Sequence, residues 1–411
     1  MKTHGSALFL AACTVLVSAA SAVGLPTALN PAPERLREYA DGCNSFATDL
    51  YLSLSGGGDD IFLSPYSIST AMAMTYAGAR GTTAGQMRHV LHFTLGGDTL
   101  HAAAGELSRS LEDFDEDSAG FGLTSVNALW GQAGHEFLPE YLGLVSTYYD
   151  AAPATLDFSR DPSACRDSIN SWISGKTRGR IEDMIPPGTI TTATRLVLAN
   201  AISFSALWRT QFDPMSTTER PFTLIDGSCV EVPLMAISEH FRIAAGDGYR
   251  AVELPYLDTS VCMLIVLPDS GRFEEIEDRM GREFIEDITM GLSDASLDLR
   301  LPRFSSTSWF SLGDVLVSMG MTAPFGGQAD FSGMDGTRWL YISSVVHQAV
   351  ISVDELGTEA SAATAVVMEK LNGEPSRPFH VDRPFIYMIM DRESGAILFL
   401  GRMMNPARGQ P

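Results

Sequence analysis

Seven short apolar runs in the second half of the chain limit the possible folds more than any other feature. They read RLVLANAISFSALW, RAVELPYL, VCMLIVLP, SLDLRLPRF, HQAVISVD, FIYMIM and AILFLGRM. Each contains a stretch of strand length and is rich in the β-branched and large apolar residues that favour β-structure. Helical patterns interrupt these runs at Phe273 to Leu292 and at Leu312 to Met319. The second half therefore predicts extensive sheets with helices set between the strands.

The first half alternates helical and strand-like patterns. A helical pattern runs from about Glu34 to Leu54, and IFLSPYSISTAMAMTYAGARG predicts a short strand followed by a buried helix. From Phe121 the strand-like TSVNALWG and ATLDF alternate with helices from Pro139 and around Ser168 to Thr177. Because no repeat, low-complexity block or linker separates these pieces, the sequence predicts one large α+β domain.

The composition excludes several kinds of partner. Of 411 residues, 45% are hydrophobic, which is enough for a large core. The 50 acidic residues outnumber the 28 basic ones, and the formal net charge is -22. Such a surface repels phosphate backbones and anionic polysaccharides. We therefore expect no nucleic-acid partner and no activation by a polyanion, and no motif predicts a cofactor or a metal site.

The N-terminus has the pattern of a secretory signal. A basic start at Lys2 precedes an apolar stretch from Ala7 to Val17 and the small residues Ala20 to Ala22. We expect residues 1–22 to be a signal peptide, residues 23–39 to be an N-terminal lead, and the mature protein to be secreted. LAAC, which ends at Cys13, also resembles a lipoprotein box, so lipid anchoring through Cys13 is the alternative.

Four cysteines remain after the signal: Cys43, Cys165, Cys229 and Cys262. Three complete disulfide pairings are open for an exported protein. The wide and irregular spacing favours buried free thiols, because a core of this size needs no covalent staples.

The segment DELGTEASAATAVVMEK, residues 354–370, combines features of a loop and of a strand. With a period of two, one set of positions is Thr358, Ala360, Ala362, Thr364, Val366 and Met368. This set is uncharged and mostly small, whereas the alternate set carries Glu359 and Glu369. The first set can face a core in a strand, but its side chains bury little apolar area.

A search for catalytic motifs finds no GxSxG elbow, HExxH helix, P-loop or dinucleotide-binding turn. Four polar residues do lie beside strongly apolar sequence: Ser64, Ser67, Asn200 and His347. Since buried polar groups need hydrogen-bond partners, they are either a cluster or four independently satisfied core residues.

An ordered set of motifs resembles the serpin family from about Ala40 to Pro406. The motifs are FLSPYSISTAMAMTYAGARGTT, VNALWGQ, EFLPEYL, INSWISGKTRGRIEDMI, LVLANAISFSALW, VELPY, MLIVLP, LRLPRF, ADFSGM, VVHQAVISVDELGTEASAATAVV, DRPFIYMI and ILFLGRMMNP. The resemblance implies a single serpin domain over residues 40–406, followed by a short tail over 407–411. It implies a large antiparallel-rich sheet A, sheets B and C, eight or nine helices and an exposed reactive-centre loop at about 355–378.

The resemblance also assigns roles to the residues above. The hinge of the loop would comprise Glu355, Gly357, Thr358, Glu359, Ala360, Ser361, Ala362, Ala363 and Thr364, with Gly357 giving the turn its freedom. Ser64, Ser67, Asn200 and His347 would form the shutter, a set of hydrogen bonds between two central strands. Trp208 would mark the breach, where loop insertion begins.

The scissile bond follows from the spacing usual in the family. Counting from Glu355 places it at Leu371-Asn372, and an apolar Leu suits chymotrypsin-like, elastase-like or subtilisin-like proteases. Lys370 is the alternative and would attract trypsin-like proteases. The loop from Glu355 to Pro384 is about two residues longer than in well-known family members. Counting back from Pro384 at the usual spacing therefore places the residue before the scissile bond at Gly373 instead of Leu371.

The function implied is suicide inhibition of a serine protease by a secreted monomer that is not itself an enzyme. The alternative is a non-inhibitory carrier, chaperone or storage protein with the same fold. Such members usually have proline, bulky or charged residues in the hinge, and Thr358 to Val366 has no proline and no charge on the inward set. The chain also lacks an N-x-S/T acceptor, which is compatible with a prokaryotic source.

Overall fold

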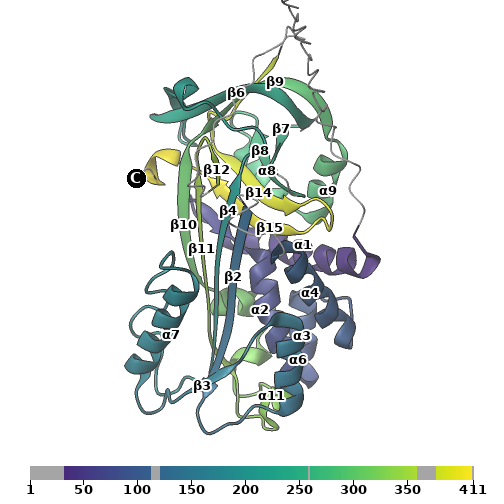
Figure 1. The fold of residues 1–411 in the computed structure, drawn as a ribbon, viewed down its shortest axis with the longest axis vertical. Helices are drawn as coiled ribbons and strands as arrows, with labels where there is room; N and C mark the ends of the chain where they lie inside the picture. The colour runs from purple at the N-terminus through teal and green to yellow at the C-terminus, as the bar shows by residue number, and fades with distance from the viewer. Residues whose placement is uncertain (1–31, 113–120, 258–259, 359–375, 410–411) are drawn as a thin grey trace, which may run out of the picture. The chain divides into compact units, whose positions relative to one another are not determined.

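The computed structural model describes residues 32–112, 121–257, 260–358 and 376–409, and the part of the chain from Pro31 to Pro411 forms one compact unit (Figure 1). The described residues form ten α-helices, slightly more than the eight or nine expected. They are α1 (Glu34–Leu54), α2 (Pro65–Gly78), α3 (Gly81–Val90), α4 (Gly97–Glu112), α6 (Pro139–Tyr149), α7 (Pro162–Lys176), α8 (Phe273–Asp278), α9 (Arg282–Met290), α10 (Gly313–Ser318) and α11 (Ser332–Asp335). No helix in these ranges is long and apolar enough to cross a membrane.

A six-stranded sheet contains the long strands near the middle of Figure 1. Its order is β10 (Phe304–Ser311), β11 (Ile342–Val353), β12 (Gly357–Thr358), β4 (Leu196–Leu207), β2 (Phe121–Gln132) and β3 (Ala154–Leu156). Strands β11 and β4 pair directly and in parallel from Ile342 with Leu196 to Val350 with Ser203. Beyond that point the short β12 lies between them and pairs with both. We call the line between β11 and β4 the seam.

The remaining strands form one nine-stranded sheet, where the resemblance implied separate sheets B and C. They are β1 (Ile61–Leu63), β15 (Ile397–Met403), β14 (Phe385–Asp391), β8 (Val261–Pro268), β7 (Tyr249–Pro255), β6 (Cys229–Gly246), β9 (Ser293–Pro302) and β13 (Arg377–His380) in order, with β5 (Thr218–Thr223) pairing β6. Strand β6 is long enough to pair β5 with its first half and β7 with its last residues. This one strand therefore joins the two parts of the sheet.

Strand β4 is covered on both faces, which explains its nearly continuous apolar sequence. Leu198, Ile202 and Phe204 face the main core, which includes α1 and α2. The alternate residues, among them Val197 and Ala199, pack in a second cluster with residues of α7. The seam is thus enclosed between the main core and α7.

Two helices differ from the sequence expectation. Helix α7 begins at Pro162 rather than near Ser168, because the Asp161 side chain accepts a hydrogen bond from the Ala164 backbone N–H at 3.0 Å and caps the helix. The helix expected over Phe273 to Leu292 is two helices, α8 and α9, since Gly281 adopts an extended conformation between them.

The four cysteines within the described residues are free thiols. Cys43, Cys165 and Cys262 are buried, but Cys229 is exposed and departs from the buried-thiol expectation. Burial raises the pKa of the Cys43 thiol to about 11, so this group stays protonated at neutral pH.

Candidate functional site

The four polar residues singled out in the sequence form one buried cluster that spans the seam. Asn200 on β4 and His347 on β11 are direct partners in the strand register, and the His347 Nδ1 lies 2.5 Å from the Asn200 Oδ1. The Ser64 backbone N–H donates to the His347 Nε2 at 3.0 Å. Ser67 accepts a hydrogen bond from the Asn200 amide, and the Ser64 Oγ caps α2 by accepting from the Ser67 N–H at 3.2 Å. The cluster therefore ties α2, β4 and β11 together.

Two members of this cluster were missed in the sequence, Ser125 and Asn127 on β2. The Ser125 and Ser67 hydroxyl oxygens lie 2.9 Å apart, and the Asn200 amide donates to the Asn127 carbonyl oxygen. Asn127 is the register partner of Asn200. The alternation of Ser125 and Asn127 within an apolar strand was the available signal, but choosing them required the pairing of β2 with β4.

His347 is the neutral imidazole in this cluster. Because Nε2 accepts from Ser64, the ring proton resides on Nδ1 and is donated to Asn200. Burial lowers the pKa of His347 to about 3. Ser64 and His347 are both 0% exposed, so neither side chain is accessible to a substrate in solution. The arrangement is suited to holding strands together, not to nucleophilic catalysis.

Gly357 and Thr358, the predicted hinge residues that the structure describes beyond Glu355, lie in the seam as β12. Gly357 pairs Leu207 and Thr358 pairs Ala206 on β4, while Thr358 also pairs Val353 on β11. A Cβ at residue 357 would lie 1.9 Å from the Ala206 carbonyl oxygen, so close approach, rather than turn freedom, requires glycine there. The Thr358 side chain is fully buried, and its hydroxyl lies 2.8 Å from that of Tyr256.

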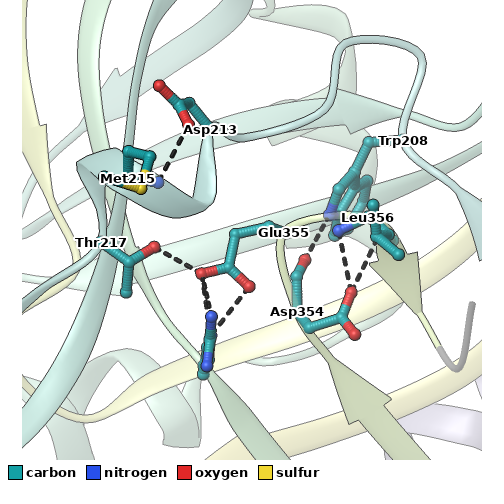
Figure 2. A network of polar contacts seen from close by, with 9 residues as sticks. Trp208, Asp213, Met215, Thr217, Asp354, Glu355 and Leu356 are labelled. Carbon is teal, nitrogen blue, oxygen red and sulfur yellow. Dashed lines mark hydrogen bonds and ion pairs between the residues drawn. The ribbon is translucent and has the colours of Figure 1, made fainter. Parts of the chain in front are cut away.

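Glu355 is anchored by hydrogen bonds at the root of the predicted hinge (Figure 2). Both carboxylate oxygens accept hydrogen bonds from the Arg303 Nε at 2.8 Å, and the Thr217 hydroxyl donates to one of them. Burial alone would raise the pKa of Glu355, but the bonds from Arg303 and Thr217 outweigh it and hold this pKa below its ordinary value. The carboxylate therefore stays ionised and anchored where the chain leaves β11.

Asp354 and Trp208 shape the turn that follows. The Asp354 carboxylate accepts from the backbone N–H groups of Leu356 at 2.8 Å and Gly357 at 3.1 Å. The Trp208 indole donates to the Asp354 carbonyl at 2.9 Å, as Figure 2 shows, and its ring stacks on Tyr256 at 4.6 Å. Trp208 thus lies beside β12 at the end of the seam where β11 and β4 separate.

The other predicted hinge and reactive-bond residues lie outside the described ranges. They are Glu359, Ala360, Ser361, Ala362, Ala363, Thr364, Lys370, Leu371 and Asn372. Residues 1–22, including Cys13, lie outside those ranges too.

Comparisons with known proteins agree with this geometry. A family model described as Serpin (serine protease inhibitor) matches residues 41–406. An uncharacterized serpin-like protein of Thermococcus kodakarensis is 40% identical over 376 residues, which cover 91% of this chain and 87% of that protein. The leukocyte elastase inhibitor of Bos taurus is 37% identical over 376 residues, covering 88% of this chain and 97% of the inhibitor. Human thyroxine-binding globulin superposes with a TM-score of 0.81 at 30% identity, over 90% of this chain and 99% of that structure. The chain therefore belongs to the serpin family of serine protease inhibitors.

Proposed function

We propose that this protein is a secreted suicide inhibitor that traps a serine protease by inserting its cleaved loop into the seam. The observation that supports this most is β12, because the loop already begins as an extra antiparallel strand between β11 and β4. The seam beyond it is closed by direct pairing, so further insertion has a defined path.

The register of β12 supports the small residues of the hinge as inserting residues. If the antiparallel pairing of Thr358 with Ala206 continues, Ala360 comes opposite Phe204 and Ala362 opposite Ile202. Phe204 and Ile202 are 0% exposed and face the main core, so only small side chains fit beside them. Alternate positions, which include Glu359, face the opposite side of the sheet.

The same register places Thr364 opposite Asn200 and next to His347. A hydroxyl at this position can replace the hydrogen bond that joins these two residues across the closed seam. Insertion would then separate the strands without leaving buried polar groups unsatisfied, which matters because each costs about 1–3 kcal/mol.

The trapping step uses the chemistry of the protease. The protease serine oxygen attacks the Leu371 carbonyl, the bond to Asn372 breaks, and the Asn372 amine leaves with a proton from the protease histidine. An ester then links Leu371 to the protease. Insertion adds strand hydrogen bonds and carries the protease away before water hydrolyses that ester, so the inhibitor supplies stored strain rather than turnover.

Leu371 as the bait residue favours chymotrypsin-like, elastase-like or subtilisin-like targets. The similarity to a leukocyte elastase inhibitor supports an elastase-like target. Lys370 remains the alternative bait and would select trypsin-like proteases. Lysine is rare in this chain, and Lys176 and Lys370 are its only lysines after Lys2, so a lysine-specific protease tests Lys370 with little background.

The deciding experiment mixes the mature protein with chymotrypsin, elastase, subtilisin, trypsin and a lysine-specific serine protease. A covalent band that survives denaturant, with the new end mapped by mass spectrometry to Leu371, is the expected result. Cleavage in the loop without such a band, and without a rise in thermal stability, would instead indicate a non-inhibitory carrier. The similarity to thyroxine-binding globulin supports this alternative, because that protein binds thyroxine and has the same fold.

Export and oligomeric state belong to the same proposal. We infer that residues 1–22 are removed on secretion and that the mature inhibitor is a monomer. Mass spectrometry of the secreted protein should give an N-terminus at Val23. A lipid-modified Cys13 at the N-terminus would replace that account.

A further inference from the structure

The two ends of the seam are built differently. At the hinge end β12 separates β11 from β4, so the seam is already open there. At the far end the strands first pair at Ile342 and Leu196, and an inserting strand must part them to that point to span the sheet. The residues just before this pair therefore decide whether insertion can be completed.

Three contacts cross the seam at, or just before, that first pair. The Tyr341 hydroxyl donates to the Ala193 carbonyl oxygen at 2.7 Å. The Arg195 backbone N–H donates to the Ser343 hydroxyl at 2.9 Å. The Arg195 guanidinium lies over the Trp339 ring at 4.2 Å from its centroid. We call these five residues the clasp, and they join the chain preceding β4 to the chain preceding β11 and to the first residues of β11.

Further contacts hold Arg195 and Trp339 in place. The Arg195 guanidinium also donates to the carbonyl oxygens of Thr192 and Thr194 at 3.1 and 2.8 Å. The Trp339 ring also stacks on His135, with the ring centroids 4.3 Å apart and an interplanar angle of 12°. His135 in turn contacts the Asp335 carboxylate at 3.2 Å. Trp339 therefore packs against both Arg195 and His135 although it is 43% exposed.

We propose that the clasp of Ala193, Arg195, Trp339, Tyr341 and Ser343 is a positioning element that must open in the last stage of loop insertion. This inference rests on the proposed function and deepens it. Moving β11 away from β4 by one strand spacing, about 4.8 Å, breaks all three contacts. Because insertion competes with hydrolysis of the acyl-enzyme, the clasp sets how many protease molecules are trapped rather than released.

An engineered disulfide across the clasp tests this directly. Arg195→Cys with Ser343→Cys joins two backbones that are already adjacent, in a Cys229→Ser background that removes the exposed native thiol. The oxidised protein should be cleaved by chymotrypsin and release it, with the number of inhibitors consumed per trapped protease at least about tenfold higher. Reduction should restore the covalent complex. Full trapping by the oxidised protein would overturn the proposal.

Trp339 supplies a second readout. Its emission should change when the Arg195 guanidinium leaves the ring, in stopped-flow mixing with chymotrypsin, and Trp339→Phe gives the background signal of the other tryptophans. Tyr341→Phe removes one neutral hydrogen bond and should speed that change about two- to tenfold. Arg338→Ala is the matched control, because Arg338 is next to Trp339 but pairs with Asp330 outside the clasp.

The outcomes separate the two proposals. If the unmodified protein forms no covalent complex with any protease, the proposed function fails. If the complex forms but no Trp339-dependent emission change accompanies it, the clasp stays closed and the inference is wrong.

Discussion

At the scale of single residues, the missing Cβ of Gly357 allows the first residues of the predicted hinge to pair with β4. Its neighbour Ala206 approaches so closely that no side chain fits, yet the backbone of Gly357 is not in the left-handed region. The pairing of β12 with β4 therefore depends on the absence of a Cβ, and the sequence alone suggested a turn instead.

Gly357→Ala should expel the first hinge residues from the seam. The added Cβ overlaps the Ala206 carbonyl oxygen, and overpacking of this kind costs about 1–3 kcal/mol. We expect a lower unfolding midpoint and reduced trapping, measured by thermal denaturation and by the yield of covalent complex. Gly143→Ala, in α6 with open space around it, is the matched control and should leave both unchanged or slightly improved.

His347 makes the stability of the native protein depend on pH. Its pKa is lowered to about 3 by burial, against about 6.5 in an unfolded chain. Between these values the unfolded state binds a proton that the folded state does not. The free energy of unfolding should therefore fall on acidification below pH 6.5, by up to about 1.4 kcal/mol per pH unit. Burial also lowers the pKa of His101, to about 4, and acts in the same direction.

Removing the titrating group separates the His347 contribution. In His347→Gln the pH dependence of the unfolding midpoint between about pH 6.5 and pH 4 should be shallower than in the unmodified protein. His240→Gln, which alters an exposed histidine on β6, should keep the original slope. An unaltered slope in His347→Gln would mean that other groups carry the dependence.

At the scale of elements, the proposed insertion requires different side chains on the two faces of the inserting strand. Positions in register with Phe204 meet the main core, whereas positions in register with Ser205 meet the opposite face. If the register of β12 continues, Glu359 of the predicted hinge belongs to the second set. The strand can therefore carry a charge on one face only.

Ala360→Arg should convert the inhibitor into a substrate. Its side chain would enter the core beside Phe204, and an unpaired buried charge costs several kcal/mol, enough to prevent insertion. We expect cleavage by chymotrypsin at an unchanged rate, with no covalent band on denaturing gels. Glu359→Arg, which replaces one charge by another on the tolerant face, should retain trapping. If Ala360→Arg traps protease as well as the unmodified protein, the register inferred from β12 is wrong.

At the scale of the whole molecule, net charge contributes to the free energy of unfolding. The formal net charge is -22, and repulsion between like charges destabilises the compact folded state more than the expanded unfolded chain. Salt shortens the screening length from about 10 Å at 0.1 M to about 3 Å at 1 M. The unfolding midpoint should therefore rise between these salt concentrations. Equal rises in NaCl and KCl would identify screening, while a rise in only one salt would indicate a specific ion site.

The pattern of the sequence determined the class of fold, and the ordered motifs determined the family, whose resemblance implied that the four polar residues lie together. Apolar strands, an Ala-rich buried helix and the alternation in residues 354–370 are local features, and each follows from periods that neighbouring residues set. Ser64, Ser67, Asn200 and His347 were identified because polar residues in apolar segments must be satisfied somewhere. Helix α1 has the predicted bounds for the same local reason.

Only the tertiary structure decided what lies across the seam. Ser125 and Asn127 join the cluster through strand pairing. The Glu355 carboxylate accepts a hydrogen bond from Arg303, which lies 52 positions earlier in the chain. The union of the strands into one nine-stranded sheet depends on the length over which β6 stays paired. The Tyr341 contact with Ala193 also joins residues distant in sequence. Such contacts come from register and from the docking of strands, which no local period of the sequence encodes.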